Sequence, residues 1–320
     1  MINKNQFKNK KIVVLGDIIL DHFIYGISNR MSPEAPVPIV EVESEKYRMG
    51  GAANVAHNIK KLGAECTLFG AIGDDNSGKK VVNLARKNNI KTELYVLKEH
   101  KTTTKSRVFI SHHQISRLDY EVRKELIVND NKQFLKKVDH HIKESDAIVI
   151  SDYCKGFISN TFAKKIIEFA TSYNKKIIVD TKKTDLTCFE NADYITPNVK
   201  ELGDISQKEI KNEKKDIEKN AIDILKKYNF KNIVVTRSDK GACIVNLNNS
   251  IFVANKKIKV FDVTGAGDSF VSIFSLMKSL GVSDKEILKI STLVGSIAVS
   301  KPGTYAVSID EIIDFIKNEK

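Results

Sequence analysis

The chain has 320 residues, of which 42% are hydrophobic, so it can bury a sizeable core and is not typical of a disordered protein. Its net charge of +12 comes from lysines spread along the chain without a nucleic-acid recognition motif, which argues against nucleic-acid binding and favours anionic substrates. No apolar run is long enough to span a membrane and no N-terminal signal pattern is present, so we expect a cytoplasmic protein.

Short apolar runs alternate with segments of helical periodicity along most of the chain. In chain order we predict a strand at 11–16, a helix at 51–62, a strand at 66–71, a helix at 77–88, a strand at 146–151, a helix at 159–171, strands at 176–180, 232–236 and 242–247, and helices at 266–280, 283–300 and 308–318. This order is typical of an α/β fold with a mostly parallel sheet that is covered by helices on both faces.

Two segments break that order, at 36–43 and 102–111. Both alternate apolar and polar residues in the manner of exposed antiparallel strands. We expect them to form a small inserted β-sheet lid on a single domain that covers residues 1–320, because no repeat or linker divides the chain. Exposed strand edges are usually covered, so we also expect a homodimer that forms through the lid strands.

Four cysteines are present, and none forms a Cys-x-x-Cys pair that would indicate a zinc or redox site. They are Cys66, Cys154, Cys188 and Cys243. Free buried thiols in a reducing compartment are the simplest interpretation.

The strongest motif is D-V-T-G-A-G-D-S-F at 262–270. Gly265, Ala266 and Gly267 lead into a predicted helix, whose free backbone N–H groups and dipole favour an anion at its start. Asp268 follows at once, where a carboxylate could take a proton from an alcohol that attacks phosphorus. On this motif alone, a glycine-rich turn with Asp268 as a helix cap is an equally good interpretation.

A second motif, M-G-G-A-A-N at 49–54, also places glycines before a helix. Gly50 and Gly51 would let a hydroxylated ligand pack on backbone, and Asn54 offers both a donor and an acceptor. A tight turn at a helix start explains the same residues without a ligand.

A third motif, G-D-x-x-x-D at 16–21, follows the first predicted strand. Ligands of open α/β sheets bind beyond the carboxyl ends of the strands, so Asp17 and Asp21 are candidates for hydrogen bonds to sugar hydroxyls. The alternative is that Asp21 is a cap or turn residue.

Together the three motifs resemble the signatures of the PfkB (ribokinase-like) carbohydrate kinases, in the right order and spacing over essentially the whole chain. The resemblance implies a three-layer Rossmann-like domain with a β-sheet lid. It also implies ATP and Mg²⁺ as cofactors and phosphoryl transfer to a sugar hydroxyl.

The resemblance also implies a role for each matching residue. Asp268 would be the catalytic base, and Gly265, Ala266 and Gly267 would form the anion hole for the γ-phosphate. Asn198 and Glu201 match an N-x-x-E element that positions Mg²⁺ through water, although a capped helix start explains the same pair. The nucleotide phosphates would lie near Thr236, Arg237 and Gly241, and the sugar would contact Asp17, Asp21, Gly50, Gly51 and Asn54.

Finer strings resemble the heptose 7-phosphate kinases within this family; they lie at 30–38, 114–119, 151–156 and 196–198. They imply phosphorylation of D-glycero-β-D-manno-heptose 7-phosphate at O1, for ADP-heptose and lipopolysaccharide core synthesis. Arg117, Lys155 and Lys182 are then candidates for binding the sugar phosphate, unless they are simply solvated surface residues.

Other interpretations stay open. The chain could be a PfkB kinase of another sugar or sugar phosphate, or a non-catalytic regulator that binds sugar or nucleotide on the same fold. The sequence contains no H-x-G-H motif, so we expect no adenylyltransferase domain within it. The family often has an asparagine near the adenine, whereas this chain has Ser291 and Thr292 in the corresponding helix, so the motif leaves the adenine contacts open.

Overall fold

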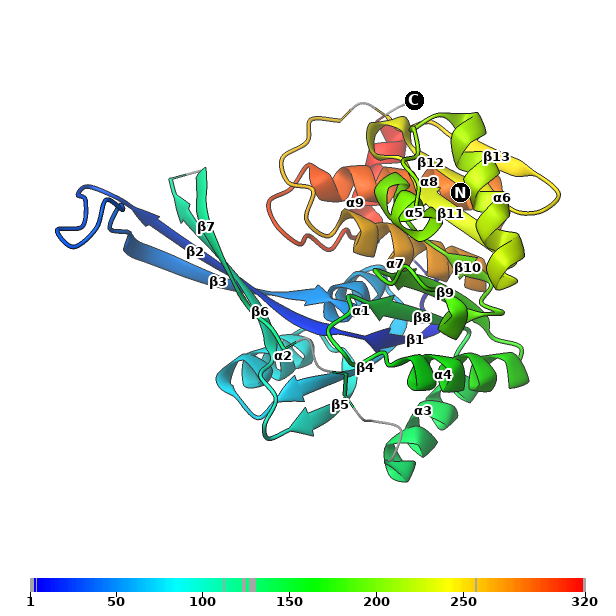
Figure 1. Ribbon diagram of the computed structural model, residues 1–320, viewed down its shortest axis with the longest axis horizontal. Coiled ribbons are helices and arrows are strands. Elements are labelled where there is room, and N and C mark those ends of the chain that lie inside the picture. The colour runs from blue at the N-terminus through cyan, green and yellow to red at the C-terminus, as the bar shows by residue number, and fades with distance from the viewer. Residues whose placement is uncertain are drawn as a thin grey trace.

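A computed structural model of the protein describes residues 3, 5–111, 113–122, 125–126, 131–256 and 258–318. Among them are two sheets, a large one that forms the body and a four-stranded one that projects to one side (Figure 1). We call the four-stranded sheet the lid. Within the described residues, no helix is long and apolar enough to cross a membrane.

The body sheet has the strand order β13-β12-β11-β10-β9-β8-β1-β4-β5. Its strands are β1 (Lys11–Gly16), β4 (Glu65–Gly73), β5 (Lys91–Leu97), β8 (Ala147–Asp152), β9 (Lys176–Thr181), β10 (Tyr194–Ile195), β11 (Asn232–Thr236), β12 (Ala242–Val245) and β13 (Ser250–Val253). All neighbours from β11 to β5 pair in parallel, and only β12 and β13 at one edge are antiparallel. The prediction of a mostly parallel sheet is therefore confirmed.

Helices cover both faces of the body sheet (Figure 1). They are α1 (Ala52–Lys61), α2 (Asn76–Lys87), α3 (Lys132–Glu144), α4 (Asn160–Ser172), α5 (Val199–Ser206), α6 (Lys214–Tyr228), α7 (Ala266–Ser279), α8 (Asp284–Val299) and α9 (Ile309–Lys317). Successive strand residues point to opposite faces: Ile12 and Val14 of β1 pack with α1, α7 and α8, while Val13 and Leu15 pack with α3, α4 and α6. Two hydrophobic layers thus enclose one sheet, which is the three-layer α/β architecture expected.

The lid contains β2 (Ile18–Ile27), β3 (Glu41–Gly51), β6 (Thr103–Ile110) and β7 (His113–Tyr120), in the order β3-β2-β6-β7. The predicted strand at 102–111 is confirmed as β6. The predicted strand at 36–43 is mostly wrong, because β3 begins only at Glu41 and runs on to Gly51. The central pair, β2 and β6, is also parallel rather than antiparallel.

The cysteines depart from prediction at one position. Cys66, Cys188 and Cys243 are buried free thiols, as expected, but Cys154 is exposed. It lies in the turn after β8, outside the two apolar layers, and has a φ of 56°.

Candidate active site

Asp268 lies in the first turn of α7, where its buried carboxylate has two donors from other parts of the chain. Its Oδ2 accepts a hydrogen bond from Asn54 Nδ2 in α1 at 2.7 Å, and its Oδ1 accepts one from the Tyr153 hydroxyl after β8 at 2.8 Å. The helix cap is Gly265 and not Asp268, which removes the interpretation of Asp268 as a cap. The structure therefore brings Asp268 and Asn54 together and adds Tyr153, which the motifs did not indicate.

The Asp268 carboxyl has an unusual proton affinity. Burial raises its pKa to about 7, while the hydrogen bond from Asn54 lowers it; the charge of Asp180 adds to the rise, and the hydrogen bond from Tyr153 opposes it. A carboxyl with a pKa near neutrality can accept a proton and release it again under ordinary conditions, as a general base requires.

The segment before Asp268 leaves room for a ligand at the start of α7. Gly265 has a φ of 80°, and a Cβ there would stand 2.9 Å from Asn54 Nδ2, so only glycine fits. A Cβ at Gly267 would meet no heavy atom within 4 Å. The Ala266 N–H makes a long hydrogen bond to the Val263 carbonyl, at 3.3 Å. No side chain caps the helix, and first-turn N–H groups have no partner within a helix, so this end of α7 can receive an anion.

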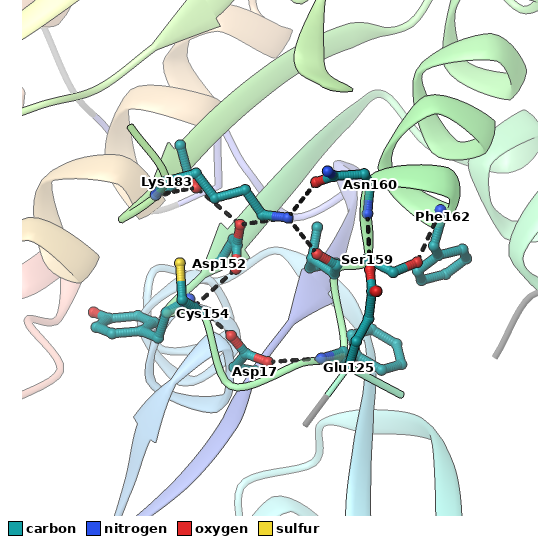
Figure 2. A network of polar contacts seen from close by, with 12 residues as sticks. Asp17, Glu125, Asp152, Cys154, Ser159, Asn160, Phe162 and Lys183 are labelled. Atoms are coloured by element: carbon teal, nitrogen blue, oxygen red, sulfur yellow. Dashed lines mark hydrogen bonds and ion pairs between the residues drawn. The ribbon is translucent and has the colours of Figure 1, made fainter. Parts of the chain in front are cut away.

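Asp17 organises the turn that carries Tyr153. Its Oδ2 accepts the backbone N–H groups of Tyr153 and Lys155 at 2.8 and 2.9 Å, and its Oδ1 accepts that of Phe157 at 3.1 Å. Figure 2 shows the Asp17 carboxylate facing this turn, with Asp152 and Cys154 above it. Both oxygens are occupied by backbone, so the structure places Asp17 as a support for the turn, beside the predicted sugar site.

Asp152 completes this support. It accepts hydrogen bonds from the Cys154 N–H and the Thr181 hydroxyl, both at 2.9 Å, and Lys183 lies 4.0 Å away (Figure 2). Burial and then the charge of Asp17 raise the pKa of Asp152 to about 6. The carboxylates of Asp17 and Asp152 thus both accept backbone N–H groups of the 153–157 segment and fix its conformation.

Asp21 and the glycines of the second motif meet where the lid joins the body. Asp21 Oδ1 accepts a hydrogen bond from Arg107 Nη1 at 2.7 Å, and both side chains are buried. A Cβ at Gly50 would stand 2.5 Å from Asp21 Oδ2, and one at Gly51, where φ is 57°, would stand 2.5 Å from the Asp17 carbonyl. The two glycines allow this close crossing of β2 and β3, and Arg107 is a site residue that sequence analysis missed.

A group of cations lies close to the lid: two come from its strands, and the third, Lys155, comes from the turn after β8. Lys105 of β6 pairs in register with Asp21 of β2 and Asp119 of β7. Burial lowers the pKa of Lys105, and the positive charges of Arg117 and Lys155 lower it further. We name Lys105, Arg117 and Lys155 the lid cations.

Two lid cations already have anionic partners. Arg117 holds Asp119 with two hydrogen bonds of 2.8 and 2.7 Å, and Lys155 forms an ion pair with Glu121. Lys182 lies apart from the group: it contacts Glu201 and lies 3.5 Å from Asp180, with its Nζ 5.5 Å from the centre of the Tyr153 ring. Burial lowers the pKa of Lys182, but the charges of Asp180 and Glu201 outweigh it and raise that pKa above its ordinary value.

The predicted N-x-x-E element is a helix cap in the structure. The Asn198 side chain accepts the Glu201 N–H and the Glu201 side chain accepts the Asn198 N–H, both at 2.9 Å. The other Glu201 oxygen faces Lys182, so the cap also fixes a carboxylate near the site. Capping does not exclude a role with a metal, since Mg²⁺ keeps several waters and needs only one or two carboxylates.

Among the described residues, no three His, Cys, Asp or Glu side chains converge to hold a metal ion. Asp180 and Glu201 nevertheless place two carboxylates around Lys182, which fits a hydrated Mg²⁺ that arrives with phosphate oxygens. Asp180 and Glu201 would then hold the ion together with its own waters.

The predicted nucleotide turns lie beside this cap. Thr236, at the end of β11, forms a bridge with Asn198, and Gly241 has a φ of 91°. Arg237 is held by the Asn212 side chain at 3.0 Å and stacks on Phe252, so its guanidinium is already occupied. A hollow of about 640 Å³ lined by Asn198, Asn212 and Ser238, among others, adjoins these turns; it does not include Asp268.

These features match those of a known family. The family described as pfkB family carbohydrate kinase matches residues 9–311. This chain belongs to the pfkB family of carbohydrate kinases. The bifunctional protein HldE of Pasteurella multocida is 36% identical over 308 residues, which cover 96% of this chain and 63% of the relative. The HldE protein of Coxiella burnetii is 33% identical over 313 residues, which cover 97% of this chain and 64% of that protein.

Solved structures of lower identity share the fold. Phosphofructokinase-2 from Escherichia coli has a TM-score of 0.78 at 22% identity, with 97% of this chain and 98% of that chain covered. Arabidopsis thaliana ribokinase complexed with ribose and ATP has a TM-score of 0.77 at 17% identity, with 96% and 99% covered. The pfkB kinase described here thus has the ribokinase-like α/β fold with a separate small sheet.

Proposed function

We propose that this kinase transfers the γ-phosphoryl group of ATP to O1 of D-glycero-β-D-manno-heptose 7-phosphate and forms the 1,7-bisphosphate for ADP-heptose and lipopolysaccharide core synthesis. The observation that carries the proposal is the buried Asp268 carboxylate, which lies beside an uncapped helix start and has a pKa raised to about 7. A base and an anion site in adjacent residues are what phosphoryl transfer to an alcohol needs.

In this mechanism Asp268 accepts the proton of the sugar hydroxyl as that oxygen attacks phosphorus. Asn54 and Tyr153 hold the carboxylate from two sides, so its orientation does not depend on the substrate. The N–H groups at 265–267 stabilise the charge on the transferred phosphoryl oxygens, and Lys182 adds a positive charge nearby. Mg²⁺, when bound with ATP near Asp180 and Glu201, would neutralise phosphate charge.

The nucleotide end of the site has one supporting observation. The hydroxyls of Ser291 and Thr292 in α8 are buried and have no hydrogen-bond partner among the described residues. Buried polar groups normally have partners, and a purine that reached either hydroxyl would supply one. They stand where the family often has the asparagine near the adenine.

The lid cations support a phosphorylated acceptor. A phosphate at the far end of the sugar from O1 needs cations away from Asp268, and charge-assisted contacts to phosphate are strong. Burial lowers the pKa of Lys105 most, and the charges of Arg117 and Lys155 lower it further, so a bound dianion would relieve the repulsion that Lys105 experiences. The strings that resemble heptose 7-phosphate kinases make the heptose the preferred sugar.

The experiment that tests the proposal is an ADP-release assay with a panel of sugars, each with and without its terminal phosphate. We expect heptose 7-phosphate to have the highest kcat/KM. Equal kcat/KM for heptose and heptose 7-phosphate would refute the phosphate site. In the same assay Asp268→Asn should lose about 10²–10⁴-fold in kcat while ATP binding survives; near-normal turnover would remove Asp268 from the mechanism.

We also propose that the kinase forms a homodimer through its lids. Strand β7 is an edge strand that exposes Ile115, Leu118 and Tyr120, with 43%, 45% and 54% of each residue accessible. An uncovered apolar edge is a template for pairing with a second chain. Sedimentation should show a dimer, and Leu118→Lys should shift it toward monomer; a monomeric wild type would refute the assembly.

A further inference from the structure

Tyr153, to which the sequence motifs gave no role, donates to Asp268 from a different part of the chain than Asn54. Its hydroxyl donates to Asp268 Oδ1 at 2.8 Å. Burial, and next the charge of Asp268, raise the pKa of Tyr153 well above its ordinary value, so the phenol stays protonated at every pH at which the enzyme would work. It can therefore give Asp268 a hydrogen bond but cannot compete with it as a base.

Contacts of its backbone as well as of its ring fix the position of Tyr153. Its N–H is held by Asp17 Oδ2 at 2.8 Å, and the next residues are held by Asp17 and Asp152. Two cations lie near the ring, with Lys182 Nζ 5.5 Å and Lys105 Nζ 5.8 Å from its centre. These contacts come from the body on one side and the lid on the other, and they hold the hydroxyl against Asp268.

We propose that Tyr153 is a positioning residue, which fixes the Asp268 carboxylate and stabilises its negative charge so that it can accept the proton of the acceptor hydroxyl. The inference rests on the proposed role of Asp268 as the base. It adds that a phenol held by Asp17 tunes this base, a role separate from binding either substrate.

The groups around Asp268 determine whether loss of the Tyr153 hydroxyl raises or lowers the pKa of Asp268. Asp180 disfavours the ionised carboxylate, whereas Lys182, Asn54 and Tyr153 favour it. Burial outweighs the favourable contacts, because the pKa still reaches about 7. Removal of the Tyr153 hydroxyl takes away one favourable contact and leaves Asp180 and burial in place, so the base becomes harder to ionise.

The test is the pH dependence of kcat at saturating ATP and sugar phosphate for wild type and Tyr153→Phe. Both substrates titrate identically in the two enzymes, so a difference between the profiles belongs to the protein. We expect the acid limb to move up by about one to two pH units in Tyr153→Phe, the size of one hydrogen bond to an ionised group, with most activity regained at high pH. A purely structural loss would lower kcat equally at all pH values and leave the limb in place, which would overturn the inference.

Two further variants complete the design. Tyr173→Phe removes a hydroxyl that donates to Asp139 at 3.3 Å far from the site, and it should leave the profile unchanged. A ring-fluorinated tyrosine at position 153, a stronger donor of the same shape, should move the acid limb down; this variant keeps the inference testable if Tyr153→Phe folds poorly. An upward or absent shift with the fluorinated residue would contradict it.

The outcomes separate this inference from the role of Asp268. If Asp268→Asn remains active, the base assignment fails whatever Tyr153 does. If Asp268→Asn is inactive and the Tyr153→Phe profile overlies that of wild type, only the role of Tyr153 fails.

Discussion

Replacement of Gly267 by valine should abolish most of the catalytic rate and leave the fold intact. A Cβ at this position would meet no heavy atom within 4 Å, so the branch point of the new side chain displaces no protein atom. Glycine within a helix costs about 0.5–1 kcal/mol relative to alanine, and valine recovers part of that. The free energy of unfolding should therefore stay the same or rise slightly.

The same isopropyl group would stand where the transferred phosphoryl group must approach the first-turn N–H groups of α7. Loss of one such donor costs about 10²–10³-fold in kcat. Gly267→Ala should lie between wild type and Gly267→Val, because a methyl group blocks less of the space.

The assay pairs steady-state ADP release with thermal unfolding of each variant. Gly265→Ala is the contrasting variant, since a φ of 80° and a contact of 2.9 Å to Asn54 Nδ2 should make it less stable as well as slower. Full turnover by a normally folded Gly267→Val would show that the loop does not receive phosphate.

The remaining predictions concern charge. The folded pKa of Asp268, about 7, exceeds its ordinary 3.8, so the wild type loses stability as pH rises through that range. The Tm of Asp268→Asn relative to wild type should therefore rise between about pH 4 and pH 7, and a difference in Tm that does not change with pH would contradict the buried charge. Lys105→Ala should raise KM for the phosphorylated sugar by about one to two decades and leave KM for ATP unchanged in steady-state kinetics, whereas equal KM values would exclude Lys105 from the phosphate site. Asp17→Asn replaces a carboxylate oxygen with a hydrogen-bond donor, so it should lower the free energy of unfolding, measured in urea, by about 1–3 kcal/mol. It should also speed amide hydrogen exchange at 153–157; unchanged slow exchange there would mean that the turn is stable without the Asp17 carboxylate.

The inner strands of the body sheet follow from sequence because they are buried on both faces, whereas the partly buried edge strands β5 and β13 were not predicted. Strand β8 is entirely buried and begins with four consecutive apolar residues, and β11 was predicted with the same bounds that it has in the structure. By contrast β2 was missed, because Asp21 and His22 interrupt its alternation and nothing local shows that it pairs with β6. The two-residue β10 gives too short a pattern to detect.

In the candidate site too, residues within local motifs could be predicted from the sequence, whereas contacts between distant parts of the chain could not. Asp268, Gly265 and Asn54 belong to motifs whose residue types carry their chemistry. The contact of Tyr153 with Asp268 spans 115 positions, and that of Arg107 with Asp21 spans 86, so no local pattern announces either. Asp17 was predicted to contact the sugar, and its carboxylate also accepts three backbone N–H groups of the segment after β8, which only the tertiary structure reveals.

The junction between lid and body contains almost no chain. Asp17 alone separates β1 from β2, and Gly51 at the end of β3 is followed at once by α1, whose first N–H donates to the Asp17 carbonyl at 3.0 Å. The links from β1 to β2 and from β3 to α1 are therefore hydrogen-bonded backbone and not flexible linkers. We expect the lid to change its angle to the body by bending its own strands. A lid from another kinase could then be grafted only together with β1 and α1. Because the links are short, a change in the angle of the lid would also move Asn54, in the first turn of α1. It would thereby move the Asp268 carboxylate, to which Asn54 donates a hydrogen bond.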